Sequence, residues 1–220
     1  MFTGDVRVEI WSDVACPWCY VGTARFERAV AETGIDVEVV YRSFELDPTV
    51  PTDGDAPPLV DYLARKFGDR DRVRAAHQRL AAAGEELGLE LNWAGMRRAN
   101  TFDCHRLLTW ALEVAGPEPQ RALKKAMLRA YFTDGEVMTD HEVLVRLVDE
   151  VGLDGDEARA VLTSDRYADG VRAARQHAYS NGIAAVPTFV VEGEHVLQGA
   201  LETEAWVRAL THLQRELTSP

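Results

Sequence analysis

The sequence is poor in cysteine, in positive charge and in long apolar runs. Its 220 residues include three cysteines, which is too few for a disulfide-stapled scaffold and fits one working pair plus one spare thiol. Asp and Glu outnumber Lys and Arg by 36 to 24, and the net charge of −12 argues against a nucleic-acid or anionic-membrane binder. No apolar run is long enough to span a bilayer.

Other signals are also missing. There is no phosphate-cradling glycine loop, no internal repeat and no low-complexity segment. The first residues carry neither an apolar signal-peptide core nor a positively charged leader, so we expect a cytoplasmic protein. From the acidic charge and the lack of a long apolar run, we expect no nucleic-acid and no membrane partner. The length allows one large domain or two small ones, and the oligomeric state is left open.

The candidate chemistry lies between residues 10 and 22, where Cys16 and Cys19 stand two residues apart. Alternating apolar residues before the pair predict a strand, and apolar residues at helical spacing after it predict a helix. Pro17 suits the first turn of that helix. Since a helix N-terminus stabilises negative charge, we expect a reactive thiolate at Cys16, with Cys19 resolving the mixed disulfide.

Periodicity and turn residues predict the remaining elements. A second strand over 36–44 completes a β-α-β unit, and a proline-rich loop follows over 48–58. Helices are predicted over 59–67, 73–87, 101–115, 119–132, 140–151, 154–162 and 165–182, with a turn at 133–135. Strands over 186–191 and 195–197, joined by a turn, precede a last helix over 203–217.

This order predicts an α/β fold interrupted by a large all-helical insertion. Without most of the helical block, the elements read β-α-β-α-β-β-α, which is a sheet with helices on both faces. We therefore predict a discontinuous domain over 1–55 and 165–220 and an insertion over 56–164.

The element order, the Cys-x-x-Cys at the first strand–helix junction and Val186-Pro187-Thr188-Phe189 resemble the thioredoxin fold with its mixed sheet. The helical insertion is similar to the DsbA branch, and Ser12–Gly22, Asn100–Asp103 and Val186–Phe189 resemble the FrnE-like subgroup of DsbA-family oxidoreductases. The resemblance implies a cis bond before Pro187, beside the cysteine pair, and substrate pairing at the backbone of Val186.

The same resemblance implies the reaction. It implies dithiol–disulfide exchange with protein or small-thiol substrates, with no cofactor other than the Cys16–Cys19 disulfide and with glutathione as a candidate co-substrate. Strongly oxidising relatives carry histidine where this chain has Trp18, which has no charge to stabilise a thiolate. We therefore expect a less depressed Cys16 pKa and a milder couple, within roughly −270 to −120 mV.

Polar residues near the pair have competing interpretations. Asp13 either shapes the turn before Cys16, which we favour, or relays a proton to the cysteines. Glu45, at the end of the second strand, is predicted to be a solvated loop residue. His105 is predicted to sit on a helix surface.

Further residues are candidates for substrate contact. Trp11 and Trp18 flank the pair and are predicted to form an apolar patch for substrates. Asn100 and Thr101 are predicted to cap a helix and to face the site. Cys104 is predicted to be a buried, inert thiol, with a third redox or regulatory thiol as the alternative.

Three other functions stay open. A structural zinc site would need Cys104 and His105 to complete the ligand set, and adjacent ligands on one helix point in different directions. Glutathione-dependent 2-hydroxychromene-2-carboxylate isomerases and kappa-class transferases share the fold, but they usually carry serine where this chain has Cys16. A chaperone-like module that binds clients through the tryptophans is the third alternative.

Overall fold

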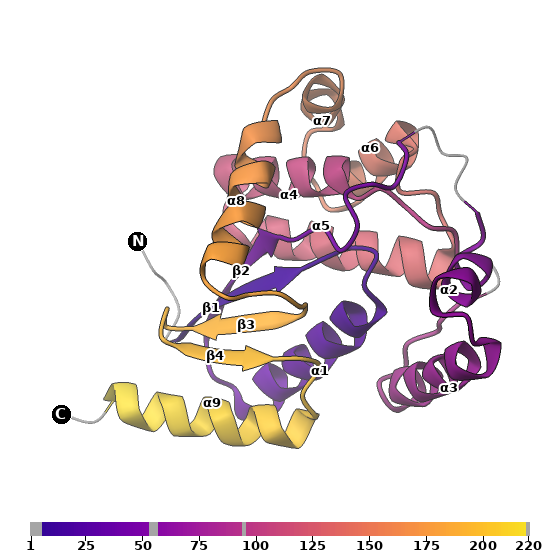
Figure 1. Cartoon of the computed structure of the whole chain (residues 1–220). Helices are drawn as coiled ribbons and strands as arrows, with labels where there is room; N and C mark the ends of the chain where they lie inside the picture. The colour runs from indigo at the N-terminus through magenta and orange to yellow at the C-terminus, as the bar shows by residue number, and fades with distance from the viewer. Residues whose placement is uncertain (1–5, 53–56, 94–95, 219–220) are drawn as a thin grey trace.

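The sheet at the centre of the protein has four strands in the order β2-β1-β3-β4 (Figure 1). The structure is a computed structural model and describes residues 6–52, 57–93 and 96–218. Strands β1 (Val6–Ser12) and β2 (Val37–Ser43) are parallel, whereas β3 (Thr188–Val191) pairs antiparallel with both β1 and β4 (His195–Gln198). The predicted mixed sheet is confirmed.

One face of the sheet is covered by α1 (Pro17–Thr33) and α9 (Thr203–Thr218). Alternate β1 residues point into this layer, as the period of two requires. The aromatic centre is formed by Phe26, Phe189 and Trp206, with the Trp206 ring centroid 4.9 Å from that of Phe26 and 4.5 Å from that of Phe189. These edge-on contacts join both helices to the sheet.

The other face carries α8 (Ala168–Ser180), which packs Ala178 against Trp11 and Phe44. The helix begins three residues after the predicted start at Asp165. The reason is Tyr167, whose φ of 65° interrupts any helix at that point.

The helical block contributes six α-helices among the described residues. They are α2 (Leu59–Phe67), α3 (Arg70–Glu86), α4 (Phe102–Ala115), α5 (Pro117–Arg129), α6 (His141–Glu150) and α7 (Gly155–Leu162). Helix α3 begins earlier than predicted because the Asp69 carboxylate accepts hydrogen bonds from two backbone N–H groups of its first turn. The turn predicted at 133–135 is instead a π-helical continuation of α5, from Ala130 to Asp134.

Helix α5 is fastened to the free edge of β2. The Gln120 side chain accepts from Tyr41 N at 2.8 Å and donates to Tyr41 O at 3.0 Å, as a neighbouring strand would. It also donates to Leu108 O of α4. An edge strand leaves these backbone groups unpaired, so one amide both satisfies the edge and fixes α5.

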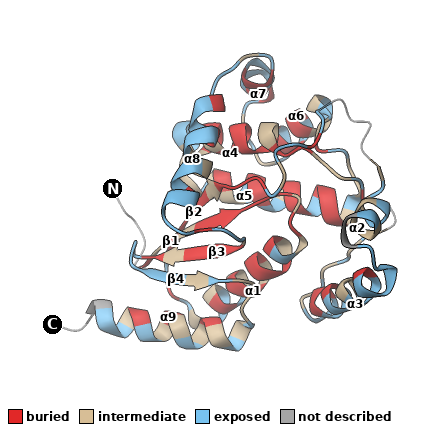
Figure 2. Cartoon of the chain, in the orientation of Figure 1, coloured by how far each residue is buried: buried red, intermediate tan, exposed pale blue. Residues whose placement is uncertain are grey.

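The buried residues form two large apolar clusters, one under the sheet and one in the helical block (Figure 2). The block's cluster also takes in Val14, from the loop before the cysteines. The division at residues 55 and 165 stays a prediction, and residues 53–56 of the predicted loop lie outside the described part. Within the described residues, no helix is long and apolar enough to cross a membrane.

Candidate active site

Cys16 is the N-cap residue of α1 and Pro17 is its first helical residue. The side chain of Cys16 is almost buried, with 4% exposure, and its thiol donates to Val186 O at an Sγ–O distance of 3.6 Å. The Val186–Pro187 peptide bond is cis, as the resemblance implied. Two segments 170 residues apart in sequence therefore meet at one sulfur.

Cys19 lies one turn further along α1 and is fully buried. Burial raises its pKa, but the neighbouring Cys16 thiol and the Lys124 ammonium outweigh this effect, so the net shift is downward. The neighbouring Cys19 thiol and burial raise the pKa of Cys16 well above its ordinary value. The two sulfurs thus share one charge, which Lys124 favours on Cys19, and the reactive Cys16 thiolate expected from the helix N-terminus stays a prediction.

Asp13 is buried beside the pair, and its carboxylate has three neighbours. It accepts from Leu46 N at 2.7 Å and from Ala15 N at 3.3 Å, and His105 Nε2 lies 3.4 Å from Oδ1. Burial raises the pKa of Asp13, but His105, the Leu46 N–H and the Lys124 ammonium together hold it below its ordinary value. The hydrogen bonds support the turn-shaping role, and the contact with His105 adds a partner that the sequence did not predict.

Two predictions about polar residues are wrong. His105 is 1% exposed and faces Asp13, so it does not decorate a helix surface. Glu45 is buried at the end of β2, where burial raises the pKa of its carboxyl group. Both errors arise because α4 and α8 cover this end of the sheet, and sequence periodicity does not reveal which helix packs there.

Lys124 of α5 is a site residue that sequence reasoning missed. It is fully buried, its Nζ has no hydrogen-bond partner within the described chain, and it lies 5.7 Å from the ring centroid of Tyr41. Burial lowers its pKa, although the nearby Cys19 and Asp13 favour the charged form. The available signal was a lysine within the apolar stripe of α5, one turn after Gln120.

The predicted tryptophan patch is wrong in one of its two members. Trp18 is 38% exposed, but Trp11 is 3% exposed and stacks on His177 with ring centroids 5.8 Å apart. Trp11 lies in β1 on the face covered by α8, so it is a packing residue. Trp18 alone can contact a substrate at the surface.

Asn100, Thr101 and Cys104 are all buried. The Asn100 amide donates to Val50 O and accepts from Phe102 N, so it starts α4 and ties a loop to it. Thr101 is the N-cap residue but makes no capping hydrogen bond with its side chain. Burial raises the pKa of Cys104, whose thiol donates to Met138 O, and such a thiol is unreactive. Substrate contact at Asn100 and Thr101 stays a prediction without support from this geometry.

Gly22 allows α1 to approach the Pro187 loop. A Cβ at this position would lie 3.0 Å from Pro187 Cγ and 3.1 Å from Ala200 Cα, which is closer than ordinary contact. Glycine therefore sets the distance between the cysteine helix and the proline. The sequence showed Gly22 three residues after Cys19 but gave no role for it.

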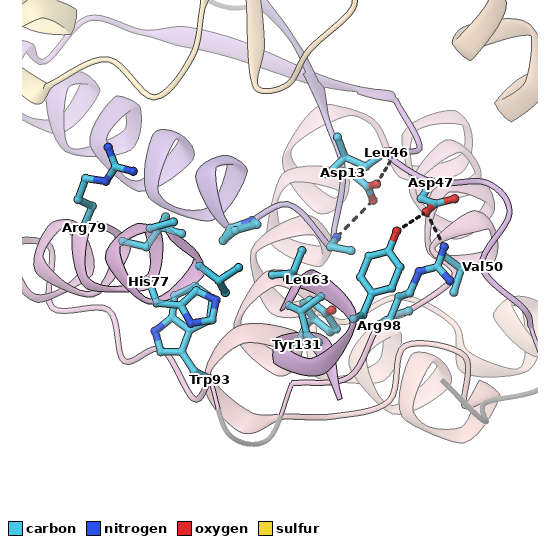
Figure 3. A pocket seen from close by; sticks show the side chains of 18 of the residues that line it. Asp13, Leu46, Asp47, Val50, Leu63, His77, Arg79, Trp93, Arg98 and Tyr131 are labelled. Carbon is cyan, nitrogen blue, oxygen red and sulfur yellow. Dashed lines mark hydrogen bonds and ion pairs between the residues drawn. The ribbon is translucent and has the colours of Figure 1, made fainter. Parts of the chain in front are cut away.

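A cavity of about 550 Å³ opens beside the pair, between the N-terminus of α1 and helices α2 and α3 (Figure 3). Asp13, Ala15 and Pro17 line it, and Figure 3 shows His77 and Trp93 on the opposite side from Asp13. The volume lies in the range of small-molecule sites. In the part of the chain that the structure describes, no group of three or more His, Cys, Asp or Glu residues could hold a metal ion.

The family model for the DSBA-like thioredoxin domain matches residues 7–211. The chain belongs to this family. Its thioredoxin-like fold with a helical insertion is thereby confirmed. The DsbA-like protein is similar to a probable DsbA oxidoreductase from Streptomyces coelicolor, SCO1869, with 41% identity and a TM-score of 0.87 over 98% of this chain and 92% of the other. It is 30% identical to the uncharacterised protein YwbO of Bacillus subtilis (strain 168), over 96% of this chain and 98% of YwbO.

More distant solved structures share the fold of the DsbA-like protein. The cytosolic disulfide reductase DsbM from Pseudomonas aeruginosa is 19% identical, with a TM-score of 0.59 over 96% of this chain and 99% of the other. A 2-hydroxychromene-2-carboxylate isomerase is 18% identical, with a TM-score of 0.70 over 96% and 97% of the two chains. DsbM has also been solved with GSH.

Proposed function

We propose that the protein is a dithiol–disulfide oxidoreductase in which Cys16 and Cys19 exchange disulfides with thiol or disulfide substrates. The observation that carries the proposal is the position of the Cys16 sulfur. It lies at the N-terminus of α1 and donates to Val186 O, and the second thiol, Cys19, lies one turn further along the same helix. Exchange requires an attacking and a resolving thiol, and the more exposed sulfur is the one on the substrate side.

In the reducing direction, the Cys16 thiol passes its proton to the Cys19 thiolate and attacks one sulfur of the substrate disulfide. The substrate's disulfide bond breaks, its other sulfur leaves as a thiolate, and a mixed disulfide forms on Cys16. Cys19 then attacks Cys16 Sγ, the Cys16–substrate bond breaks, and the departing substrate thiolate takes up the Cys19 proton and leaves as the second thiol. Two enzyme thiols are oxidised and one substrate disulfide is reduced; oxidation of a substrate dithiol is the reverse sequence.

Buried charge supports the resolving step. Cys19 must be a thiolate when it attacks, and Lys124, whose Nζ makes no hydrogen bond among the described residues, favours that state. Asp13 is held in its charged form by His105 and Leu46 N–H, so its own charge is balanced locally. The protein thus provides a cation beside the sulfur that carries the charge.

The test uses two variants. Cys16→Ser should abolish insulin reduction and dithiol oxidation, whereas Cys19→Ser should accumulate mixed disulfides detectable by mass spectrometry. Full turnover by Cys16→Ser would refute the proposal. Membership of the FrnE-like subgroup, glutathione as co-substrate and a cytoplasmic location stay predictions; cell fractionation checks the last.

A glutathione-dependent isomerase is the second candidate, and the cavity beside Pro17 favours it because such an enzyme needs a site for a small substrate. An isomerase regenerates glutathione without a dithiol cycle, so Cys19→Ser would keep full activity. An oxidoreductase with the same change would stall. The chaperone alternative loses support because Trp11 is buried.

A further inference from the structure

The cavity beside the cysteines is apolar over most of its wall. Helices α2 and α3 contribute about half of its apolar residues, including Leu59, Leu63 and Leu80. Pro17, which directly follows Cys16, and Ala15, which directly precedes it, both line the cavity. A molecule bound there would therefore lie beside the chain segment that carries Cys16, and burial of its apolar surface would supply binding energy.

The charges at the cavity are matched except for two arginines. Asp47 pairs with Arg98, and Asp13 is occupied by its own hydrogen bonds (Figure 3). Arg72 and Arg79 also line the cavity, yet neither side chain makes an ion pair or hydrogen bond within the part of the chain that the structure describes. They stand two turns apart on α3, on one side of the helix. In a chain of net charge −12, this local positive excess favours an anion.

The far end of the cavity has a flat aromatic wall. His77 lies on Trp93 with ring centroids 4.1 Å apart and planes inclined by 14° (Figure 3). Burial lowers the pKa of His77, which favours its neutral ring. The buried His77 Nε2 and Trp93 Nε1 have no hydrogen-bond partner among the described residues. Buried polar atoms are normally paired, so this wall offers a flat molecule both stacking and polar contacts.

We propose that the cavity binds a small anionic aromatic thiol or disulfide and presents its sulfur to Cys16, which makes such compounds the preferred substrates. This inference rests on the proposed function and names its substrate class. The positive charges of Arg72 and Arg79 attract the acid group, and the apolar wall with His77 and Trp93 holds the ring. With a disulfide, Cys16 attacks, one aryl thiolate leaves, and attack by Cys19 releases the second while the enzyme disulfide forms.

Two synthetic disulfides provide the test. Dithiobis(nitrobenzoate) is aromatic and anionic, dithiodipyridine is aromatic and neutral, and each releases a coloured thiol from the reduced enzyme. We expect Arg72→Gln/Arg79→Gln to lower kcat/KM for the anionic compound by roughly tenfold and to leave the neutral compound within about twofold. Arg74→Gln is the matched control, because Arg74 is on the same helix, is exposed and already pairs with Asp71.

A binding measurement separates this inference from the redox proposal. Anilinonaphthalene sulfonate, a flat apolar anion, should bind Cys16→Ser and lose affinity when both arginines are replaced in that background, with a loss that shrinks at high salt. An equal fall in kcat/KM for the two disulfides, or the same fall in Arg74→Gln, would overturn the proposed substrate class of the cavity. It would leave the redox proposal standing. Failure of the wild-type enzyme to react with either disulfide, while the anion still binds, would overturn the redox function instead.

Discussion

The cysteine pair has a buried polar side and an apolar open side, and the two differ in origin. The buried side combines Asp13, His105 and Lys124, which come from the β1–α1 loop, α4 and α5. The open side combines Pro17 and Trp18 with the cavity under α2 and α3. The groups on the buried side set the pKa values of the two cysteines, whereas the groups on the open side determine which substrate binds. Changes on one side should therefore leave the property of the other side intact.

The largest effect on the buried side is expected from Lys124→Met. Loss of the ammonium removes a charge that favours the Cys19 thiolate, so the pKa of Cys19 should rise, as ultraviolet titration of the reduced protein can measure. Disulfide exchange near neutral pH should slow by roughly tenfold. The protein should also become more stable by about 1–4 kcal/mol, because a buried ammonium without a hydrogen-bond partner among the described residues is replaced by an apolar chain of similar size.

The control for this change is Lys125→Met on the same helix. Lys125 is half-exposed, and its Nζ lies 2.9 Å from Glu27 Oε2. Lys125→Met should therefore change neither the Cys19 titration nor the rate of disulfide exchange. An unchanged Cys19 titration in Lys124→Met would show that the buried side does not govern the thiolate.

Asp13→Asn should destabilise the protein by about 1.5–3 kcal/mol near neutral pH, since hydrogen bonds to a charged acceptor are lost. The folded-state pKa of Asp13 is lowered, so its contribution is present above the unfolded value of about 3.9 and is lost as the pH falls through the folded value. Urea unfolding at a series of pH values should show the gap to the wild type closing in acid. A stability difference that does not change with pH would show that the charge of Asp13 does not stabilise the fold.

Gln120→Leu tests whether the sheet edge fixes the buried side. It leaves Tyr41 N and O unpaired, and we expect a loss of about 1–3 kcal/mol in the free energy of unfolding. Because α5 also carries Lys124, the thiolate titration should shift with it. A loss of stability that leaves the Cys19 titration unchanged would show that the sheet edge does not fix the position of Lys124.

At neutral pH, Glu45→Gln should change the free energy of unfolding by less than Asp13→Asn does, and in the stabilising direction. Burial raises the pKa of Glu45, so its contribution to stability is greatest below the unfolded value of about 4.3 and is lost as the pH rises through the folded value. The variant should therefore be more stable than the wild type at neutral pH and equal to it in acid. Thermal unfolding at two pH values distinguishes this from a uniform change.

Cys104→Ala should have the smallest effect, with no change in turnover. The thiol is fully buried and donates to Met138 O, so native reduced protein should not be alkylated there. Peptide mass spectrometry after brief alkylation measures this. Rapid labelling of Cys104 would support the alternative of a third redox thiol.

Features formed by residues close together in the sequence could be predicted, whereas features that bring distant segments together could not. Cys16, Pro17 and Cys19 are local, and strand–helix periodicity alone placed them at a helix N-terminus. The helices of the block were also found, because Asp140 and Asp154 cap α6 and α7 as their positions suggested. What could not be predicted was tertiary: that α5 would place Lys124 under the cysteines, and that α4 would bury His105.

The errors have the same cause. The alternation of residues in β1 predicted that Trp11 faces away from the α1 side of the sheet. The strand sequence does not reveal that α8 covers this second face and buries Trp11. The π-helix at Ala130–Asp134 adds one residue to a helical turn. This extra residue breaks the 3.6-residue period, so the sequence pattern predicted a turn where the helix continues. The cavity needs α2 and α3 to stand beside α1, which no local pattern indicates.

The most direct test of dithiol–disulfide exchange at Cys16 and Cys19 is the equilibrium of this couple with glutathione buffers. Mass spectrometry after acid quenching and alkylation gives the fractions of dithiol and intramolecular disulfide. We predict one reversible two-electron transition, within roughly −270 to −120 mV and milder than the histidine-bearing oxidants because Trp18 carries no charge. A pair that stays reduced at every ratio, or forms only a stable glutathione adduct, would contradict the account.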